Sequence, residues 1–119
     1  MSQSVFPSLR YRDAAAVLPW LVSVFGLTER AVYADADGVV RHAELGWDDD
    51  TIMIGTAASG GGSSWLYLTV ADPDGHHSRA VAAGAEVVHG PADKDHGSRE
   101  YTARDPEGNL WTFGTYVPA

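Results

Sequence analysis

The stretch Arg99 to Tyr116 reads R-E-Y-T-A-R-D-P-E-G-N-L-W-T-F-G-T-Y and predicts a β-hairpin. Residues 99–104 alternate as a strand does, and residues 110–116 are rich in aromatic side chains and threonine, which strands favour. The segment between them, Asp105-Pro106-Glu107-Gly108-Asn109, is dense in turn formers. Proline presets one turn dihedral, and glycine and asparagine tolerate a positive φ.

This hairpin has an earlier counterpart in the chain. A shift of 59 residues places Asp72 on Asp13, and Trp111-Thr112-Phe113-Gly114 on Ile52-Met53-Ile54-Gly55. The turn before the last strand then falls on Trp47-Asp48-Asp49-Asp50, with no gap between these anchors. We interpret the chain as two copies of one unit.

The two copies form one domain over residues 1–119. They occupy about 1–57 and 64–119, and a Gly/Ser-rich linker at 58–63 falls where the repeat needs a flexible connection. Each copy has the pattern of a strand, a helix and three further strands. We expect strands at 5–11, 29–34, 39–46, 51–57, 65–71, 85–89, 99–104 and 110–116, helices at 14–25 and 76–83, and a polar loop at 90–97. Asp13 can cap the start of the first helix, and the run from Asp72 to Gly75 starts the second. Pro19 should bend or divide the first helix, because proline lacks an N–H.

Strand alternation assigns the two faces of each strand. One set of faces is aliphatic or aromatic and should carry the helices: Ile52, Ile54, Leu66, Leu68, Trp111 and Phe113. The opposite, mixed faces include Met53, Trp65, Tyr67 and Thr112. These faces should form a concave surface, where a small ligand would bind.

Composition excludes several classes of protein. At 119 residues with 45% hydrophobic content, the chain can bury a substantial core. Its formal net charge of −8 argues against a nucleic-acid partner, which would need a basic patch. The chain has no cysteine, so disulfides and thiol chemistry are absent. No signal peptide and no long apolar run are present, so we expect a cytoplasmic protein without membrane contact.

The two β-α-β-β-β units, with Asp-Pro-Glu-Gly-Asn before the last strand, resemble the vicinal oxygen chelate superfamily. The run from Gly97 to Tyr101 leading into 105–111 is similar to its glyoxalase/bleomycin-resistance branch. The resemblance implies an α+β fold in which two tandem βαβββ modules form a curved eight-stranded mixed sheet with helices on the convex face. It also implies a homodimer with pockets at or near the dimer contact.

In metal-using members of that superfamily the ligands, commonly His, Gln or Glu, come from the first, fourth, fifth and eighth strands. The positions that the resemblance matches here are Phe6, Met53, Trp65 and Thr112. None supplies an imidazole or a carboxylate, which divalent ions of this type require. We therefore expect no metal and no cofactor. These positions would instead form an apolar, partly aromatic floor suited to a flat organic ligand.

Other residues are candidates with an ordinary structural alternative. The gapless repeat pairs His42 with Tyr101, and both could hydrogen-bond a ligand or act as acid or base if they face the concave surface. The alternative for His42 is a packed or exposed strand histidine. Arg99 could recognise an acidic ligand group, or it could brace the hairpin. Trp47, at a turn, and Trp65 could stack on a ligand or pack in the core.

We predict a metal-independent protein that binds a small molecule in an apolar, aromatic pocket, for example to sequester an antibiotic or another aromatic compound. The alternative is a lyase or isomerase of glyoxalase type, or another enzyme of the same superfamily, including a metal-free one that uses His42 or Tyr101. The sequence does not identify the ligand.

Overall fold

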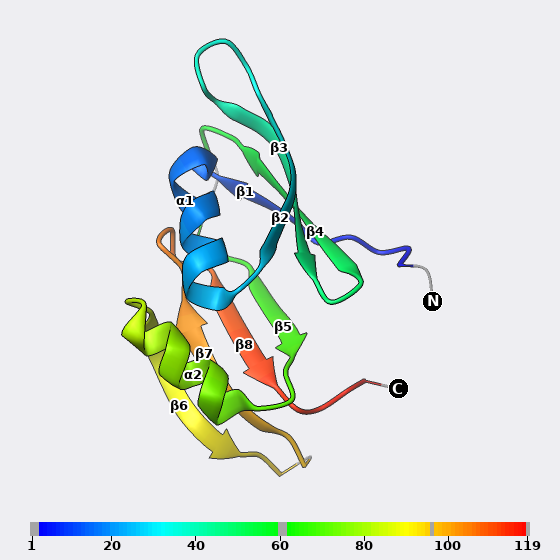
Figure 1. The fold of residues 1–119 in the computed structure, drawn as a ribbon, viewed down its shortest axis with the longest axis vertical. Coiled ribbons are helices and arrows are strands. Elements are labelled where there is room, and N and C mark those ends of the chain that lie inside the picture. The colour runs from blue at the N-terminus through cyan, green and yellow to red at the C-terminus, as the bar shows by residue number, and fades with distance from the viewer. Residues whose placement is uncertain (1–2, 60–61, 96, 119) are drawn as a thin grey trace. The chain divides into compact units, whose positions relative to one another are not determined.

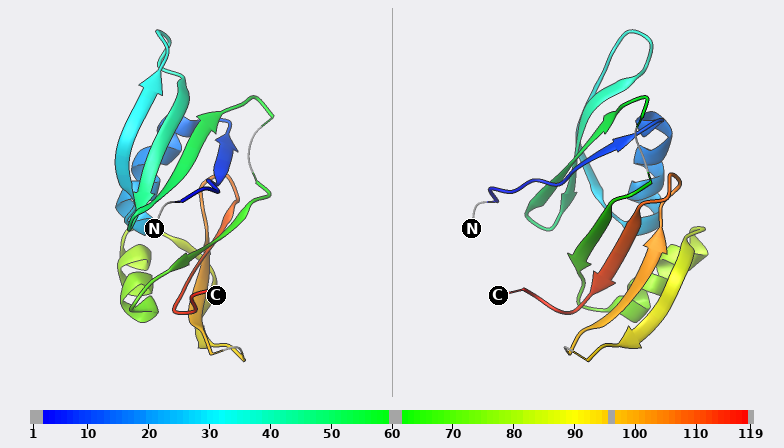
Figure 2. Two further views of the ribbon diagram at one scale, coloured as in Figure 1. Left: turned by 90° about the vertical axis from the view of Figure 1, so that its right-hand side faces the viewer. Right: turned by 180° about the vertical axis from the view of Figure 1, so that it is seen from behind.

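The computed structural model describes residues 3–59, 62–95 and 97–118. The chain divides into two compact units, Met1–Gly62 and Ser63–Ala119, which are drawn in Figures 1 and 2. The boundary falls inside the linker predicted at 58–63. Residues 60 and 61 of that linker, and residue 96 of the predicted loop, lie outside the described residues.

The first unit contains a helical segment and four strands (Figure 1). Its elements are β1 (Ser8–Tyr11), α1 (Ala14–Trp20), a π-helical turn η1 (Leu21–Phe25), β2 (Thr28–Ala34), β3 (Val40–Trp47) and β4 (Asp50–Thr56). The strands form one sheet in the order β1-β4-β3-β2. β1 and β4 are parallel, whereas the other neighbours are antiparallel.

The second unit repeats this plan. Its elements are β5 (Trp65–Thr69), α2 (Pro73–Ala82), β6 (Glu86–Asp93), β7 (Arg99–Arg104) and β8 (Leu110–Gly114). The sheet order is β5-β8-β7-β6, with β5 and β8 parallel and the remaining pairs antiparallel. The α+β fold with two βαβββ modules is thus confirmed, and the eight strands are hydrogen-bonded as two four-stranded sheets.

Helix starts and stops follow the sequence signals. The Asp13 carboxylate accepts the Ala16 N–H at 3.3 Å and the Asp72 carboxylate accepts the Gly75 N–H at 3.1 Å, so both aspartates cap helices. The predicted division of the first helix is confirmed, because α1 changes to a π-helical turn just after Pro19. That turn ends at Gly26, whose φ of 85° suits glycine.

Each helix covers one face of its sheet. In the first unit Leu18 and Leu21 are buried with Leu45 and Ile54, and in the second unit Trp111 and Phe113 are fully buried. The ring of Phe113 lies 4.2 Å from that of His76 on α2, measured between ring centroids. The apolar faces therefore carry the helices as predicted. Within the described residues no helix is long and apolar enough to cross a membrane.

The second unit differs from expectation at β6, which continues to Asp93 where a polar loop was predicted from residue 90. Gly90 and Pro91 suggested a loop, but β6 is an edge strand and its pairing with β7 shifts register between Val87 and His89 and again between His89 and Ala92. Edge strands and β-bulges are the places where a sheet accepts proline. The prediction of a loop at 90–93 is therefore wrong.

Candidate functional site

The open face of each sheet is the face turned away from its helix. On the open face of the second sheet, Trp65 is 65% exposed although it is a large aromatic residue. Its indole Nε1–H donates to Oγ1 of Thr112 on β8 at 2.8 Å. The Thr112 hydroxyl is in turn hydrogen-bonded to the Thr102 hydroxyl on β7 at 2.7 Å. This chain of hydrogen bonds fixes the orientation of the ring while most of the ring stays in water.

Tyr67 lies two residues after Trp65 on the same face and is 37% exposed. Its hydroxyl donates to the Tyr116 carbonyl oxygen at 2.7 Å and lies 3.4 Å from the Ser98 hydroxyl. Gly114 leaves space for it, since a Cβ at Gly114 would lie 2.7 Å from the Tyr67 hydroxyl oxygen. The phenol is therefore held by the protein, and its ring offers a second aromatic surface beside Trp65.

The turn at 105–109 places these groups. The buried Asp105 carboxylate accepts the backbone N–H groups of Glu107 and Asn109, each at 3.0 Å. Its other oxygen accepts the Asn109 side-chain amide at 3.1 Å and the Trp111 indole N–H at 3.0 Å. The Asn109 side-chain oxygen accepts the Ser64 N–H at 3.0 Å, next to Trp65. Asp105 thus fixes the start of β8, and Asn109 fixes the start of β5.

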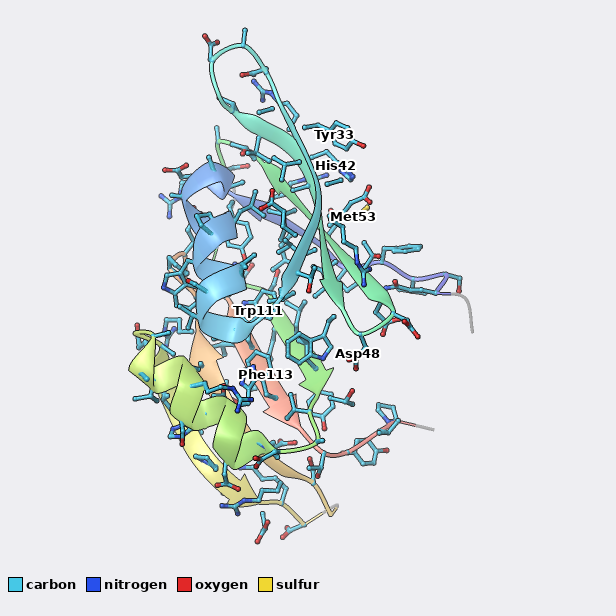
Figure 3. The ribbon with its side chains drawn as sticks, viewed as in Figure 1. Tyr33, His42, Asp48, Met53, Trp111 and Phe113 are labelled. Carbon is cyan, nitrogen blue, oxygen red and sulfur yellow. The ribbon has the colours of Figure 1, made fainter. Side chains whose placement is uncertain are left out.

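The open face of the first sheet carries a different set of side chains. His42 Nε2 lies 2.9 Å from a carboxylate oxygen of Glu44, two residues along β3. The ring of Tyr33 on β2 stacks on His42 at 5.9 Å between centroids. Met53 pairs with Glu44 across the β3–β4 ladder and is half-buried. In Figure 3, Tyr33, His42 and Met53 project from the side of the sheet opposite α1.

Tyr101 does not share a face with His42, which corrects the expectation from the gapless repeat. Tyr101 pairs with Phe113, whereas its structural counterpart Ala43 pairs with Ile54. The second hairpin is therefore one residue longer than the first, and a slip of one residue moves a side chain to the other face. Tyr101 is 1% exposed and shares a hydrogen bond with His76. Burial raises the pKa of its hydroxyl, so the phenol stays protonated and is no candidate base.

The four positions expected to form the ligand floor divide between the units. Phe6 is 44% exposed and lies before β1 rather than in it. The parallel pairing places Ser8, not Phe6, beside Met53, and Tyr67, not Trp65, beside Thr112. Trp47 is the last residue of β3 and half-buried. Among residues 3–59, 62–95 and 97–118, no group of three or more His, Cys, Asp or Glu side chains is placed to hold a metal ion.

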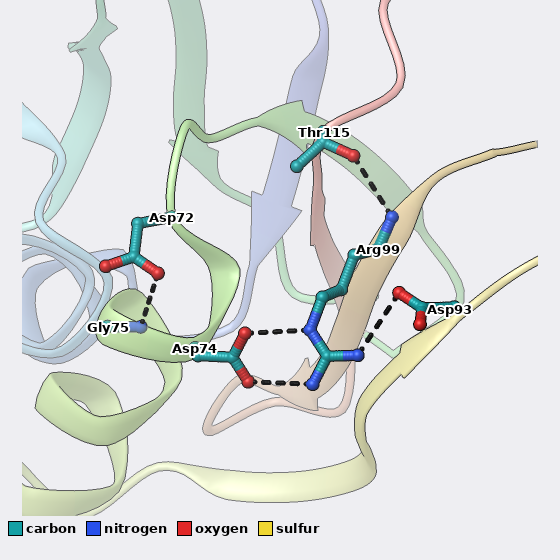
Figure 4. Close-up of polar contacts among 6 residues, drawn as sticks. All are labelled: Asp72, Asp74, Gly75, Asp93, Arg99 and Thr115. Carbon is teal, nitrogen blue, oxygen red and sulfur yellow. Dashed lines mark hydrogen bonds and ion pairs between the residues drawn. The ribbon is translucent and has the colours of Figure 1, made fainter.

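Arg99 braces the second unit (Figure 4). Its guanidinium makes a two-pronged contact with the Asp74 carboxylate at the start of α2, with N–O distances of 2.7 and 2.9 Å. A third contact reaches Asp93 at the end of β6 at 3.2 Å. The Arg99 N–H also donates to the Thr115 hydroxyl at 3.0 Å. The guanidinium is thus engaged by two carboxylates, which supports the structural alternative for this residue.

Replacing Arg99 with glutamine should lower the thermal midpoint of the protein at pH 7. Hydrogen bonding from Arg99, together with its charge, holds the pKa of Asp74 below its usual range. Because the pKa of Asp74 is lower in the folded than in the unfolded state, the ion pair adds stability at pH values above the unfolded pKa, which is near 4. That stability is lost as the pH falls through the folded-state pKa. The difference in midpoint between wild type and Arg99→Gln, measured by calorimetry, should shrink below about pH 4. An equal difference at pH 7 and pH 3 would contradict this account of Asp74.

The order of elements, the two matching units and the aromatic open face define a protein of the βαβββ-repeat type. The model of the Glyoxalase/Bleomycin resistance protein/Dioxygenase superfamily matches residues 5–113. The chain therefore belongs to this superfamily, as its sequence resemblance implied.

Similar proteins span nearly the whole chain. Uncharacterized protein Rv0887c of Mycobacterium tuberculosis is 32% identical over 124 residues, covering 93% of this chain and 73% of that protein. The crystal structure of TioX from Micromonospora sp. ML1 is 32% identical with a TM-score of 0.82, covering 98% of this chain and 100% of that one. A superfamily enzyme from Burkholderia phytofirmans, at 18% identity and a TM-score of 0.70 over 94% of this chain and 97% of that one, shares the fold.

Proposed function

We propose that this chain binds a planar aromatic small molecule on the open face of its second sheet, with Trp65 as the stacking surface and without a metal ion. The observation that carries the proposal is the exposed indole of Trp65, held by its hydrogen bond to Thr112. A solvent-exposed tryptophan presents a large apolar area, and covering it with a flat ring is favourable by about 25 cal/mol per Å².

The aromatic side chains of this face are held in place before a ligand binds, which favours binding. A free tryptophan side chain would lose rotamer freedom on binding, which costs roughly 0.5–1.5 kcal/mol. The contact from Trp65 to Thr112, and from Thr112 to Thr102, fixes the indole before a ligand arrives. The neighbouring Tyr67 is fixed as well, through its hydroxyl. A rigid pair of aromatic rings on one strand is suited to a rigid flat ligand.

The donor chemistry favours binding without a metal. The open face of the second sheet exposes the indole of Trp65 and the phenol of Tyr67, and it also holds the buried hydroxyls of Thr102 and Thr112. Divalent ions in proteins prefer imidazole, carboxylate or thiolate ligands, and none of those four residues supplies one. The Glu100 carboxylate, on the same face of β7 as Thr102, accepts the Ser98 hydroxyl at 2.8 Å. Membership of the superfamily does not itself decide between binding and catalysis, because one fold hosts many functions.

Thr112→Val should weaken binding of a planar probe about fivefold, because it removes the group that fixes the indole while preserving side-chain volume. The measurement is a titration with naphthalene, indole and quinoline derivatives, followed in ¹⁵N-correlated spectra. The chain has four tryptophans, so the indole N–H of Trp65 can be assigned and monitored alone. Thr28→Val, on an exposed edge strand of the first unit, is the matched control and should leave the affinity unchanged. Unperturbed Trp65 resonances with every probe would overturn the proposal.

We also propose the homodimer that the sequence resemblance implies. Light scattering coupled to gel filtration at several protein concentrations tests it, and a mass of one chain throughout would exclude it.

A further inference from the structure

Four residue positions form a line across the open face of the first sheet. Arg10 on β1 pairs with Gly55 on β4. His42 on β3 lies next to Gly55, because Ala43 pairs with Ile54 in the same ladder. Tyr33 on β2 pairs with His42. We call Arg10, Gly55, His42 and Tyr33 the cross-strand row.

The Arg10 guanidinium lies directly above Gly55. A Cβ on Gly55 would be 2.4 Å from Nη1 of Arg10, so only glycine allows the side chain to cross the sheet at this level. Neighbouring strands are about 4.8 Å apart, and the side chain therefore extends from β1 over β4 toward His42 on β3. The guanidinium is thus brought toward the stacked rings of His42 and Tyr33.

Arg10 makes no hydrogen bond or ion pair with any residue in 3–59, 62–95 or 97–118. Other arginines of the same unit are engaged. Arg30 donates to the Asp48 and Asp50 carbonyl oxygens and to the Thr51 hydroxyl, and Arg41 pairs with Asp35 at 2.8 Å. A guanidinium laid on a sheet presents a planar fork of N–H donors, which matches the two oxygens of a carboxylate.

In the second unit the space above the equivalent glycine is also filled by a polar group, but that group is hydrogen-bonded within the unit. Gly114 corresponds to Gly55, and the Tyr67 hydroxyl lies above it. That hydroxyl is satisfied by the Tyr116 carbonyl oxygen. His42 corresponds to Glu100, whose carboxylate accepts the Ser98 hydroxyl at 2.8 Å. The polar group above the glycine is therefore paired within the second unit, whereas in the first unit it is a cation without a described partner.

We propose that the cross-strand row is a recognition site for an aromatic carboxylic acid. The Arg10 guanidinium takes the carboxylate through two parallel hydrogen bonds, and the stacked rings of His42 and Tyr33 contact the aromatic ring. The carboxylate of Glu44, two residues along β3 from His42, lies 2.9 Å from the His42 ring. This site goes beyond the proposed function, because it lies in the other unit and uses neither Trp65 nor Thr112.

The test compares 1-naphthoate with the neutral 1-naphthamide, both titrated into full-length wild-type protein and followed in ¹⁵N-correlated spectra. We expect 1-naphthoate to bind at least tenfold more tightly, with the largest shifts at the amides of Arg10, Gly55, His42 and Tyr33. Arg10→Gln should abolish the preference, and Arg10→Lys should retain only part of it, because lysine keeps the charge but loses the planar fork. Arg79→Gln on α2 makes the same change of net charge in the other unit and should preserve the preference.

Several results of these titrations would overturn the inference. Equal affinity for the two probes in wild type, or a preference that survives Arg10→Gln, would overturn the inference. A titration with inorganic phosphate tests whether the row binds any anion or specifically an aromatic acid. If phosphate binds at the row as tightly as 1-naphthoate does, the assignment to an aromatic acid is overturned. Shifts at Trp65 with both probes, but none at the row, would leave the proposed function intact while the inference fails. Since Arg10 is exposed, unchanged amide spectra outside the row will show that its variants are folded.

Discussion

Asp105→Ala is expected to lower the free energy of unfolding by about 4 kcal/mol, close to the limit that a domain of this size tolerates. Asp105 is 3% exposed and accepts four hydrogen bonds, from Glu107, from the backbone and side chain of Asn109, and from Trp111. Hydrogen bonds to a charged group contribute about 1.5–3 kcal/mol each, and a buried donor left unpaired costs about 1–3 kcal/mol. The fully buried Trp111 indole N–H would be left in that state.

Urea unfolding followed by circular dichroism measures the loss in free energy of unfolding caused by Asp105→Ala, with Asp49→Ala as the control. Asp49 lies in the corresponding turn of the first hairpin and is exposed, so its loss should change stability by less than about 0.5 kcal/mol. Asp105→Asn provides a second variant with nearly the same shape. Because asparagine replaces one acceptor oxygen by a donor, Asp105→Asn should lower the free energy of unfolding by more than half of the loss expected for Asp105→Ala. A loss below about 1 kcal/mol for Asp105→Ala would show that the turn is not organised by this carboxylate.

Trp65→Ala is expected to weaken binding of a neutral planar probe at least tenfold, equivalent to about 1.4 kcal/mol, while the protein remains folded. The indole is 65% exposed, so its removal leaves no cavity in the core. Trp65→Phe keeps an aromatic ring but lacks the N–H that donates to Thr112. Its affinity for the probe should therefore lie between those of wild type and Trp65→Ala. The prediction is measured by calorimetric titration with the best neutral probe from the aromatic panel.

Val81→Ala is the control for Trp65→Ala. Val81 is another exposed hydrophobic residue, 47% accessible, but it lies on α2 and not on an open face. Its loss should leave the affinity for a neutral probe within twofold of wild type. If Trp65→Ala binds as tightly as wild type, or if Val81→Ala loses as much affinity, Trp65 is not the stacking surface.

Much of the fold could be predicted from strand periodicity and capping residues. The alternation of Trp65 and Tyr67 with Leu66 and Leu68 gave the correct faces for β5, because a strand repeats every two residues. The two caps, Asp13 and Asp72, were visible because short polar side chains favour helix starts. Both features depend on local chemistry, which a single sequence carries.

Features that depend on register between strands could not be predicted. The extra residue in the second hairpin turned Tyr101 toward the core, and no local signal marks where a repeat gains one residue. Thr102 became part of the site through its contact with Thr112, which exists only once β7 and β8 are paired. Arg10 was missed for the same reason, since its place above Gly55 depends on the parallel pairing of β1 and β4.

The central claim is that the chain binds a flat aromatic molecule on Trp65 and needs no metal to do so. The most direct measurement is the affinity of wild-type protein for its best planar probe before and after dialysis against EDTA, with the metal content of both samples counted by mass spectrometry. The account predicts the same dissociation constant in both samples, with the Trp65 indole resonance shifting in each. Roughly one metal ion per chain before dialysis, together with loss of binding after it, would contradict the account and favour a metal-dependent site.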